Sequence, residues 1–290
     1  MSPARLRIAM QKSGRLADKS LQLIEAAGFR VIKGANELLY RIENAPIDLL
    51  RVRDDDIPTF VGDGVADFGI VGRNVLEERV EGARPVEIMP LGFGRCDLRI
   101  ATPKDFAYGG PHSLSGERIA TTYPNILRRF LKENDIKAEI VTMRGAVEVA
   151  PRLKLARAIC DLVSTGATLE ANGLIPVETI LESEAVLIQS RAAIAPEFAP
   201  LADSLITRLR GVTASRGAKY VMMNAPRAKL PEITAILPGA DAPTVTPLAG
   251  RDEAVAIHAV CQESVFWETL EKLKTAGASA ILVLPIEKMM

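Results

Sequence analysis

A run of small and hydroxylated residues follows an apolar stretch and its closing acid in CDLVSTGATL, residues 160–169. The apolar stretch is typical of a strand, and the pattern predicts that a helix begins near Thr168. The backbone N–H groups of such a helix start, with the hydroxyls of Ser164 and Thr165, suit a phosphate group. Asp161, at the end of the strand, could accept hydrogen bonds from ribose hydroxyls. A plain strand–turn–helix with Thr168 as its N-cap explains these residues equally well.

A second segment, QKSGRL at residues 11–16, follows the first predicted strand and places Lys12 and Arg15 on either side of Gly14. Both cations lie where a helix is expected to begin, and positive charge opposes the helix dipole at that end. An anion bound between them would account for the arrangement. Taken alone, a solvated surface loop is the plainer interpretation.

The segment RVRDDDIP at residues 51–58 combines cations and acids at the end of another predicted strand. Arg51 and Arg53 lie at the carboxyl end of that strand, where open α/β sheets bind their ligands. A metal site is one interpretation of the acids 54–56. Helix capping and compensation of the helix dipole is the favoured interpretation for at least two of them.

Other side chains limit the chemistry. Glu148, in RGAVEVAP at residues 144–151, could accept hydrogen bonds in a cleft or be an exposed charge. His112 and His258 are the only histidines, and the sequence has neither a GxSxG nor a GxxxxGK[ST] motif. We therefore expect chemistry in which the substrates supply both the nucleophile and the leaving group.

Apolar runs alternate with helical patterns along the first two thirds of the chain, which predicts parallel strands joined by helices and hence an α/β sheet. The pattern restarts near residue 95. We expect one lobe from residues 1–94 with 187–214 and another from residues 95–186, with a ligand cleft between them. The clearest predicted elements are the strands Leu6–Met10, Pro46–Val52 and Asp67–Val71 and the helices Leu16–Ala27, Ile57–Asp63, Asn125–Asn134 and Pro196–Arg210.

The last portion, residues 215–290, is predicted to be a separate ferredoxin-like domain because its elements follow the order β-α-β-β-α-β. With no obvious catalytic residue, it suits regulation or oligomerisation. Its predicted elements are strand Tyr220–Met223, helix Pro226–Leu237, strands Pro243–Leu248 and Ala254–Cys261, helix Ser264–Ala276 and strand Ser279–Ile286.

Composition excludes several classes of partner. Lysine and arginine total 36, as do aspartate and glutamate, so the formal net charge is zero. A general nucleic-acid binder needs a basic excess, whereas a few clustered cations suffice for a small anion. Three cysteines without a CxxC pair predict reduced thiols in a cytoplasmic protein. No apolar run approaches the roughly 18 residues of a membrane span, so we expect no membrane association.

The segments QKSGRL, LLRVRDDDIP, DFGIVG, GAVEVAP and CDLVSTGATLEANGL occur in this order, and with them the chain closely resembles the ATP phosphoribosyltransferases of histidine biosynthesis. The tail segments KYVMMNAP, LPGADAPTVTPLAG and GASAILVLPIEKMM resemble the C-terminal domain of that family's long form. The resemblance covers nearly the whole chain. It implies a two-lobed α/β core like that of periplasmic binding proteins, followed by a ferredoxin-like (ACT-like) regulatory domain.

The resemblance also implies a reaction. N1 of the ATP adenine attacks C1 of phosphoribosyl pyrophosphate and releases pyrophosphate, with Mg²⁺ carried largely by the substrate and no protein metal ligand assigned. Histidine is the expected feedback inhibitor, and a homo-hexamer is the expected assembly. The resemblance makes Arg15, Arg51 and Arg53 catalytic; Lys12, Gly14, Glu148, Asp161, Ser164, Thr165, Gly166, Ala167 and Thr168 substrate-binding; and Asp241, Thr244, Ala278 and Ser279 part of the inhibitor site.

Other interpretations stay open at this point. A two-lobed protein could bind a nucleotide or another anion without catalysis, or the chain could be an inactive regulatory subunit of a histidine-pathway complex. One feature separates the chain from the Rossmann-like class of phosphoribosyltransferases, which carry two adjacent acids before their phosphate loop. Here Asp161 follows Cys160, so that class's paired-carboxylate grip on ribose does not transfer.

Overall fold

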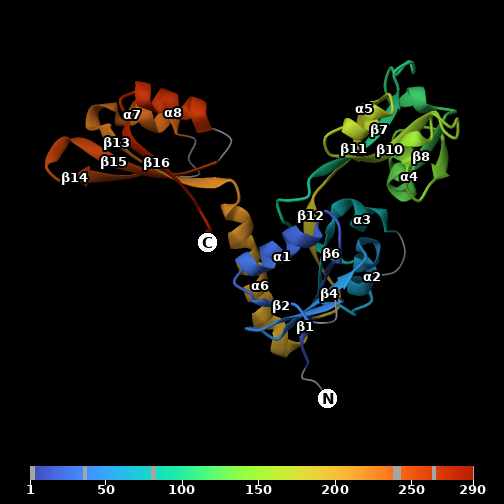
Figure 1. The fold of residues 1–290 in the computed structure, drawn as a ribbon, viewed down its shortest axis with the longest axis horizontal. Helices are drawn as coiled ribbons and strands as arrows, with labels where there is room; N and C mark the ends of the chain where they lie inside the picture. Colours follow the sequence, from blue (N-terminus) through green and yellow to red (C-terminus); the bar gives the residue numbers. More distant parts are fainter. Residues whose placement is uncertain (1–3, 35–37, 80–82, 238–242, 263–265, 290) are drawn as a thin grey trace. The chain divides into compact units, whose positions relative to one another are not determined.

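The computed structural model describes residues 4–34, 38–79, 83–237, 243–262 and 266–289 (Figure 1). The chain divides into two compact units, residues 1–204 and residues 205–290. The boundary falls within α6, Ala199–Ser215, which follows the 3-10 helix η4, Pro196–Phe198. Within the described ranges, no helix has both the length and the apolar character needed to cross a membrane.

The first sheet of the first unit is built around three parallel strands. In sheet order its described strands are β2 Val31–Ile32, β3 Leu39–Ile42, β4 Ile47–Val52, β1 Leu6–Gln11, β5 Phe68–Gly72, β12 Ala185–Gln189 and β6 Val86–Pro90. β1 pairs in parallel with β4 and β5, and Gln11 is the partner of Val52, so β1 and β4 end at the same edge. β3 runs antiparallel to β4 on one side of this centre, and β12 runs antiparallel to β5 on the other. The outermost strands β2 and β6 are antiparallel to β3 and β12, so they run in the same direction as the central strands.

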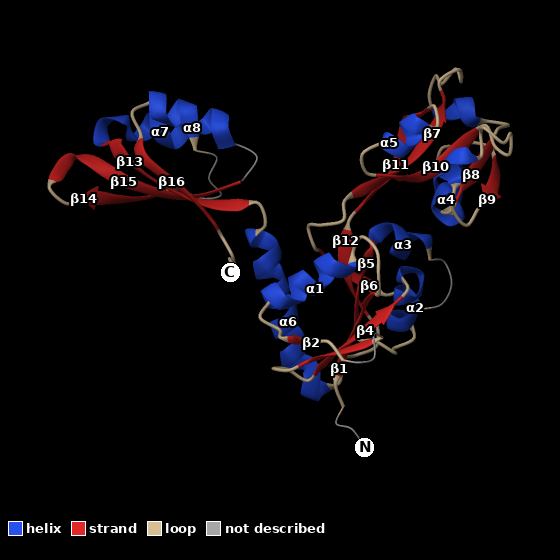
Figure 2. Ribbon diagram, in the orientation of Figure 1, coloured by secondary structure: helices blue, strands red, loops and turns tan. Residues whose placement is uncertain are grey.

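Helices cover both faces of this first sheet (Figure 2). α2, Ile57–Gly62, and α3, Arg73–Glu78, bury Ile57, Val61 and Leu76 against apolar residues of β1, β5 and β12. α1, Ala17–Ala26, lies on the opposite face and buries Leu23 and Ile24. The sheet core thereby fixes the loops that follow β1 and β4.

The second sheet of the first unit has its own core. In sheet order its described strands are β11 Leu174–Ser183, β7 Cys96–Pro103, β10 Ala158–Val163, β8 Arg118–Thr121 and β9 Glu139–Thr142. β10, β8 and β9 are parallel to one another. β7 runs antiparallel to β10, and β11 runs antiparallel to β7. α4, Pro124–Glu133, packs on one face, and the 3-10 helix η3, Val147–Val149, packs with α5, Ala167–Ala171, on the other.

Two connections join the two sheets. One runs from β6 to β7 and the other from β11 to β12, and they lie against each other: the Leu91 amide donates to the Ala185 carbonyl at 2.9 Å, and the Ala185 amide donates to the Phe93 carbonyl at 2.8 Å. The amide of Arg73, at the start of α3, donates to the Glu184 carbonyl at 2.9 Å. The first unit is therefore two α/β lobes joined by a double crossing.

The second unit is an antiparallel sheet covered by two helices. Its described elements are, in chain order, β13 Ala218–Pro226, η5 Arg227–Lys229, α7 Leu230–Ile236, β14 Thr244–Leu248, β15 Arg251–Gln262, α8 Phe266–Thr275 and β16 Ser279–Pro285. The sheet order is β14-β15-β13-β16, which is the split β-α-β arrangement of a ferredoxin-like domain. Val221, Met223 and Ile257 from the sheet pack with Ile233 of α7 and Leu273 of α8.

The predicted fold class is confirmed, from the α/β core with two lobes to the β-α-β-β-α-β order of the C-terminal domain. One predicted helix is partly wrong. The expected helix Pro226–Leu237 begins only at Leu230, because β13 continues to Pro226 and pairs there with Ala254. Pro231 lies in the first turn of α7, where its missing N–H costs no helical hydrogen bond.

Candidate active site

Cations lie at the carboxyl ends of β1 and β4. Lys12, Arg51 and Arg53 line one cavity of about 420 Å³, together with residues 11, 13, 38, 52, 54 and 56. The guanidinium of Arg51 lies 4.4 Å from the centre of the Tyr40 ring and donates hydrogen bonds to the Tyr40 hydroxyl and the Lys12 carbonyl. Stacking and hydrogen bonding on both sides hold this guanidinium in a fixed direction.

Arg15 has a different environment from the other predicted cations. It does not line the cavity of Lys12 and Arg51, and its Nη2 lies 3.5 Å from the Cys96 Sγ at the start of β7. The loop that follows β1 and contains Arg15 is held by the Gln11 side chain, whose Oε1 accepts a hydrogen bond from the Leu16 amide at 3.0 Å. The structure therefore groups three of the four predicted cations and places the fourth beside the interlobe crossing.

The three consecutive acids form the 3-10 helix η1, Asp54–Asp56, ahead of α2. The capping part of the expectation is wrong, because Asp56 is the N-cap of α2 but makes no side-chain capping bond. All three acids lie in the first turn of η1, which is the position expected for compensation of a helix dipole. The tight 3-10 turn gives Asp56 helical dihedral angles, whereas a capping side chain needs an extended residue. Burial and the neighbouring carboxylates, Asp54 foremost, raise the pKa of Asp55.

Asp161, Glu148 and the loop of residues 164–168 come together in the second lobe. Val147 of η3, Ile159 of β10 and Leu169 of α5 are buried in one core cluster. Because side chains alternate along a strand, Asp161 lies on the same face of β10 as Ile159. This core therefore brings Glu148 to the same end of the sheet as Asp161 and the loop that follows it.

The Asp161 carboxylate lies in a partly buried environment close to another acid. Burial raises its pKa, a hydrogen bond from the Leu162 amide to its Oδ1 at 2.8 Å lowers it, and the charge of Glu148 raises it further. Two carboxylates held this close repel each other unless a cation or hydroxyl donors lie between them. The pair is thus suited to bind a ligand that supplies positive charge or O–H groups.

The loop before α5 presents backbone and hydroxyl groups to solvent. Ser164, Thr165 and Thr168 are exposed, and Gly166 takes the left-handed conformation with φ of 80°. Gly166 is the N-cap of α5 and no side chain caps the helix, so the alternative in which Thr168 is an ordinary N-cap is wrong. The first amides of α5, from Ala167 onward, are therefore directed at whatever lies in front of the loop.

A second cavity is lined by both lobes. It has a volume of about 620 Å³ and is lined from the first lobe by Arg53, Asp55, Thr59, Val75, Glu78 and Arg79, and from the second by Thr122, Tyr123, Met143 and Arg144. The second-lobe residues directly follow β8 and β9, whose ends are in register with each other and with Cys160 of β10, the residue before Asp161. Sequence reasoning missed them, although the TTYP segment after a strand carries the same positional signal as Arg53.

The Tyr123 hydroxyl interacts with groups from both lobes. Its hydroxyl accepts a hydrogen bond from the Asn74 Nδ2 of α3 at 3.0 Å. Burial raises the pKa of Tyr123, the bond from Asn74 lowers it, and the charges of Asp161 and Asp54 raise it. The charge of acids from both lobes therefore acts on this hydroxyl, and Tyr123 lies in the cavity that both lobes line.

The residues expected at an inhibitor site lie in the second unit. Thr244 begins β14 and is exposed, Ala278 is buried, and Ser279 begins β16. β14 and β16 are the two opposite edges of the described sheet. Asp241 lies outside the described residues.

Fold and cavity together define a two-lobed α/β protein of the periplasmic-binding-protein type, with cations and hydroxyl groups at the strand ends between its lobes. The chain belongs to the ATP phosphoribosyltransferase family: residues 53–211 match that family, and residues 215–288 match the HisG C-terminal domain. Its reaction is accordingly the transfer of a phosphoribosyl group from phosphoribosyl pyrophosphate to N1 of ATP, in histidine biosynthesis.

The chain is also similar to solved structures. The ATP phosphoribosyl transferase (HisG:HisZ) complex from Thermotoga maritima is 25% identical with a TM-score of 0.59, over 71% of this chain and 98% of that chain. The periplasmic aliphatic sulphonate binding protein SsuA from Escherichia coli is 17% identical with a TM-score of 0.49, over 74% of this chain and 75% of that chain.

Proposed function

We propose that the transfer takes place in the space shared by the two lobes, with one substrate held mainly by each lobe. The observation that supports this placement is the cavity of about 620 Å³ lined by strand ends of both sheets. We further propose that residues 1–94 with 187–214 and residues 95–186 act as the two catalytic lobes. Bringing two substrates into one such space lowers the entropic part of the barrier.

Phosphoribosyl pyrophosphate is assigned to the second lobe. The amides of Gly166, Ala167 and Thr168 and the hydroxyls of Ser164 and Thr165 are proposed to hold its 5-phosphate. In the same assignment, Asp161 and Glu148 accept hydrogen bonds from the ribose hydroxyls, which would relieve the repulsion between the two carboxylates. This arrangement leaves C1 facing the shared space.

The cations of the first lobe are assigned to phosphate groups. Lys12, Arg15, Arg51 and Arg53 are proposed to bind the ATP phosphates and the departing pyrophosphate, with Gly14 allowing close approach of the backbone. Adenine N1 is itself a nucleophile, so no protein base is needed. Negative charge grows on the leaving pyrophosphate, and preoriented guanidinium groups stabilise that charge in the transition state.

Magnesium dependence is part of the proposal. No group of three or more potential ligand side chains occurs among the described residues, whereas Mg²⁺ at phosphate sites needs only one or two carboxylates besides the substrate oxygens. Asp161 and Glu148 form such a pair and would hold the ion on the ribose side. When bound, Mg²⁺ neutralises charge on the pyrophosphate.

Regulation and assembly are assigned to the second unit. We propose feedback inhibition by histidine through Asp241, Thr244, Ala278 and Ser279, and a cytoplasmic homo-hexamer. Deleting the residues after 214 should abolish inhibition by histidine in the enzyme assay. Inhibition that survives this deletion would contradict the assignment.

The activity is tested by incubating the full chain with ATP, phosphoribosyl pyrophosphate and Mg²⁺ and following release of pyrophosphate and formation of N1-phosphoribosyl-ATP. Replacing Thr165 by Trp should raise the KM for phosphoribosyl pyrophosphate more than the KM for ATP. An equal rise for both substrates would mean that the loop serves another ligand. No turnover by folded protein would leave a binding role without catalysis.

A further inference from the structure

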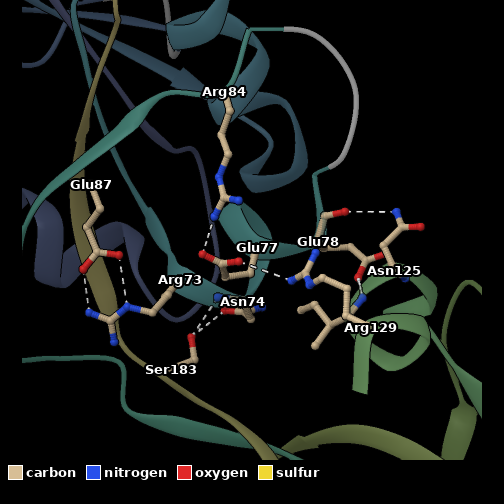
Figure 3. Close-up of polar contacts among 10 residues, drawn as sticks. Arg73, Asn74, Glu77, Glu78, Arg84, Glu87, Asn125, Arg129 and Ser183 are labelled. Atoms are coloured by element: carbon tan, nitrogen blue, oxygen red, sulfur yellow. Dashed lines mark hydrogen bonds and ion pairs between the residues drawn. The ribbon is translucent and has the colours of Figure 1, made fainter. Parts of the chain in front are cut away.

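The short helix α3, Arg73–Glu78, carries polar contacts from the first lobe to the crossing strands and to the second lobe (Figure 3). At its start, the Asn74 amide donates to the Ser183 hydroxyl at 3.0 Å, and that hydroxyl donates to the Asn74 Oδ1 at 2.9 Å. Asn74 and Ser183 are both buried. The start of α3 is therefore fixed to β11 close to the crossing.

At its other end, α3 supplies the cap of a helix in the opposite lobe. The two carboxylate oxygens of Glu78 accept hydrogen bonds from the consecutive amides of Asn125 at 2.8 Å and Ile126 at 2.9 Å. The Asn125 Nδ2 donates to the Glu78 carbonyl at 3.0 Å. These amides belong to the first turn of α4, whose own N-cap, Tyr123, makes no side-chain capping bond.

A helix normally satisfies its first amides with its own N-cap side chain, and a carboxylate at that end also interacts favourably with the helix dipole. Here both roles fall to a carboxylate from the other lobe. Burial raises the pKa of Glu78 although the amides of Ile126 and Asn125 lower it. The neighbouring contact from Glu77 to Arg129, at 3.2 Å, is more exposed and therefore weaker.

The residues that precede α4 form the second-lobe wall of the shared cavity. Thr122 and Tyr123 line it opposite Arg53, and Glu78 lines it as well. Any change at the Glu78 bond to α4 therefore moves this wall relative to the cations of the first lobe. We propose that Glu78 is a positioning residue, which holds the two lobes in the orientation that both substrates require by capping α4 from across the cavity.

The proposal leads to a specific kinetic pattern. If the cap is lost, only a fraction of molecules has the competent orientation, and the apparent affinity for each substrate falls by that fraction. Saturating substrates restore the orientation, so kcat is largely retained. For Glu78→Gln we expect the KM values for ATP and for phosphoribosyl pyrophosphate to rise together by about tenfold, with kcat within about twofold.

The test uses the full chain and two readouts. The amides of Asn125 and Ile126 should exchange hydrogen about tenfold faster in Glu78→Gln than in the wild type. Glu139→Gln is the matched control, since it removes an exposed carboxylate paired with Arg118 inside the second lobe. Asn125→Ala removes the hydrogen bond from the Asn125 side chain to the Glu78 carbonyl and should raise both KM values by a smaller factor. This variant replaces Glu78→Gln in the test if Glu78→Gln does not fold.

The KM values of the variants decide whether the proposal holds. A joint rise in both KM values, absent in Glu139→Gln, supports the proposal. Unchanged KM values in folded Glu78→Gln, or a fall in kcat alone, would overturn it, because those results belong to a purely structural or a chemical role. The proposal rests on the proposed placement of the transfer between the two lobes, but the exchange measurement tests the cap even if the wild type shows no turnover.

Discussion

Asp161 and Glu148 illustrate how single side chains of the site depend on each other. Burial and the charge of Glu148 both raise the pKa of Asp161. If the ionised Asp161 accepts hydrogen bonds from ribose, activity is lost as pH falls through this raised pKa. Glu148→Gln removes one source of the rise and should move the acid limb of kcat/KM to lower pH. It should also lower kcat/KM for phosphoribosyl pyrophosphate by about tenfold, the scale of one charged hydrogen bond. If the acid limb of Glu148→Gln stays at the wild-type pH, Glu148 does not influence the pKa of Asp161 and the prediction is wrong.

The same pKa predicts a trade between stability and activity. Because the folded pKa of Asp161 lies above its ordinary value of 3.8, the group's contribution to stability is complete below pH 3.8 and is lost as pH rises through the folded pKa. At pH 7 the ionised group therefore opposes folding. Asp161→Asn should raise the free energy of unfolding at pH 7 by about 1 kcal/mol while lowering turnover. Urea unfolding at pH 7 and at pH 3 measures the difference in the free energy of unfolding between Asp161→Asn and the wild type. The same difference at both pH values would contradict the prediction.

At the scale of elements, the phosphate loop depends on one glycine. Gly166 has φ of 80°, and a Cβ built on it meets no atom within 4 Å, so Gly166→Ala is strained only in its backbone. We expect a loss of about 1 kcal/mol in the free energy of unfolding. Because the strain changes the direction of the first amides of α5, the KM for phosphoribosyl pyrophosphate should rise about tenfold. Calorimetry and steady-state kinetics measure the two effects.

The first lobe offers a matched control for this loop. Gly64, which follows α2, has φ of 74° and equally open surroundings. Gly64→Ala should lower the stability to the same degree and leave both KM values unchanged. A similar rise in KM for this variant would show that the effect of Gly166→Ala comes from general destabilisation.

The parts of the site that lie within one stretch of chain could be predicted from the sequence, whereas those that depend on the order of the strands could not. Strand, loop and helix around Asp161 follow from local patterns, because apolar periodicity and turn residues act over a few positions. Tyr123 and Arg144 escaped prediction because they reach the shared cavity only through the order β10-β8-β9 of the second sheet, which no local pattern contains. Glu78 escaped for a related reason: a helix cap is sought within a helix's own chain segment, whereas this one comes from the other lobe.

At the scale of the whole molecule, one face of the second unit's sheet remains open in the single chain. Leu282 and Leu284 of β16 are 52% and 51% exposed, and Tyr220, the β13 partner of Leu284, is 36% exposed. Val221 and Val283, which alternate with them, face the helices instead. Apolar side chains gathered on an open face indicate association with another chain. We therefore expect this face to contribute to the proposed hexamer.

Association would also explain the predicted inhibitor residues. Thr244 and Ser279 lie on opposite edges of a four-stranded sheet among the described residues, which separates them by about 14 Å at ordinary strand spacing. A single histidine cannot contact both within one copy, so the proposed site requires two copies. Leu282→Glu should therefore dissociate the assembly and abolish inhibition by histidine while transfer continues. Sedimentation velocity and inhibition curves measure this, and Leu153→Glu is the control, since Leu153 is a leucine of the second lobe that is 64% exposed. A variant that dissociates yet is still inhibited would place the inhibitor within one copy.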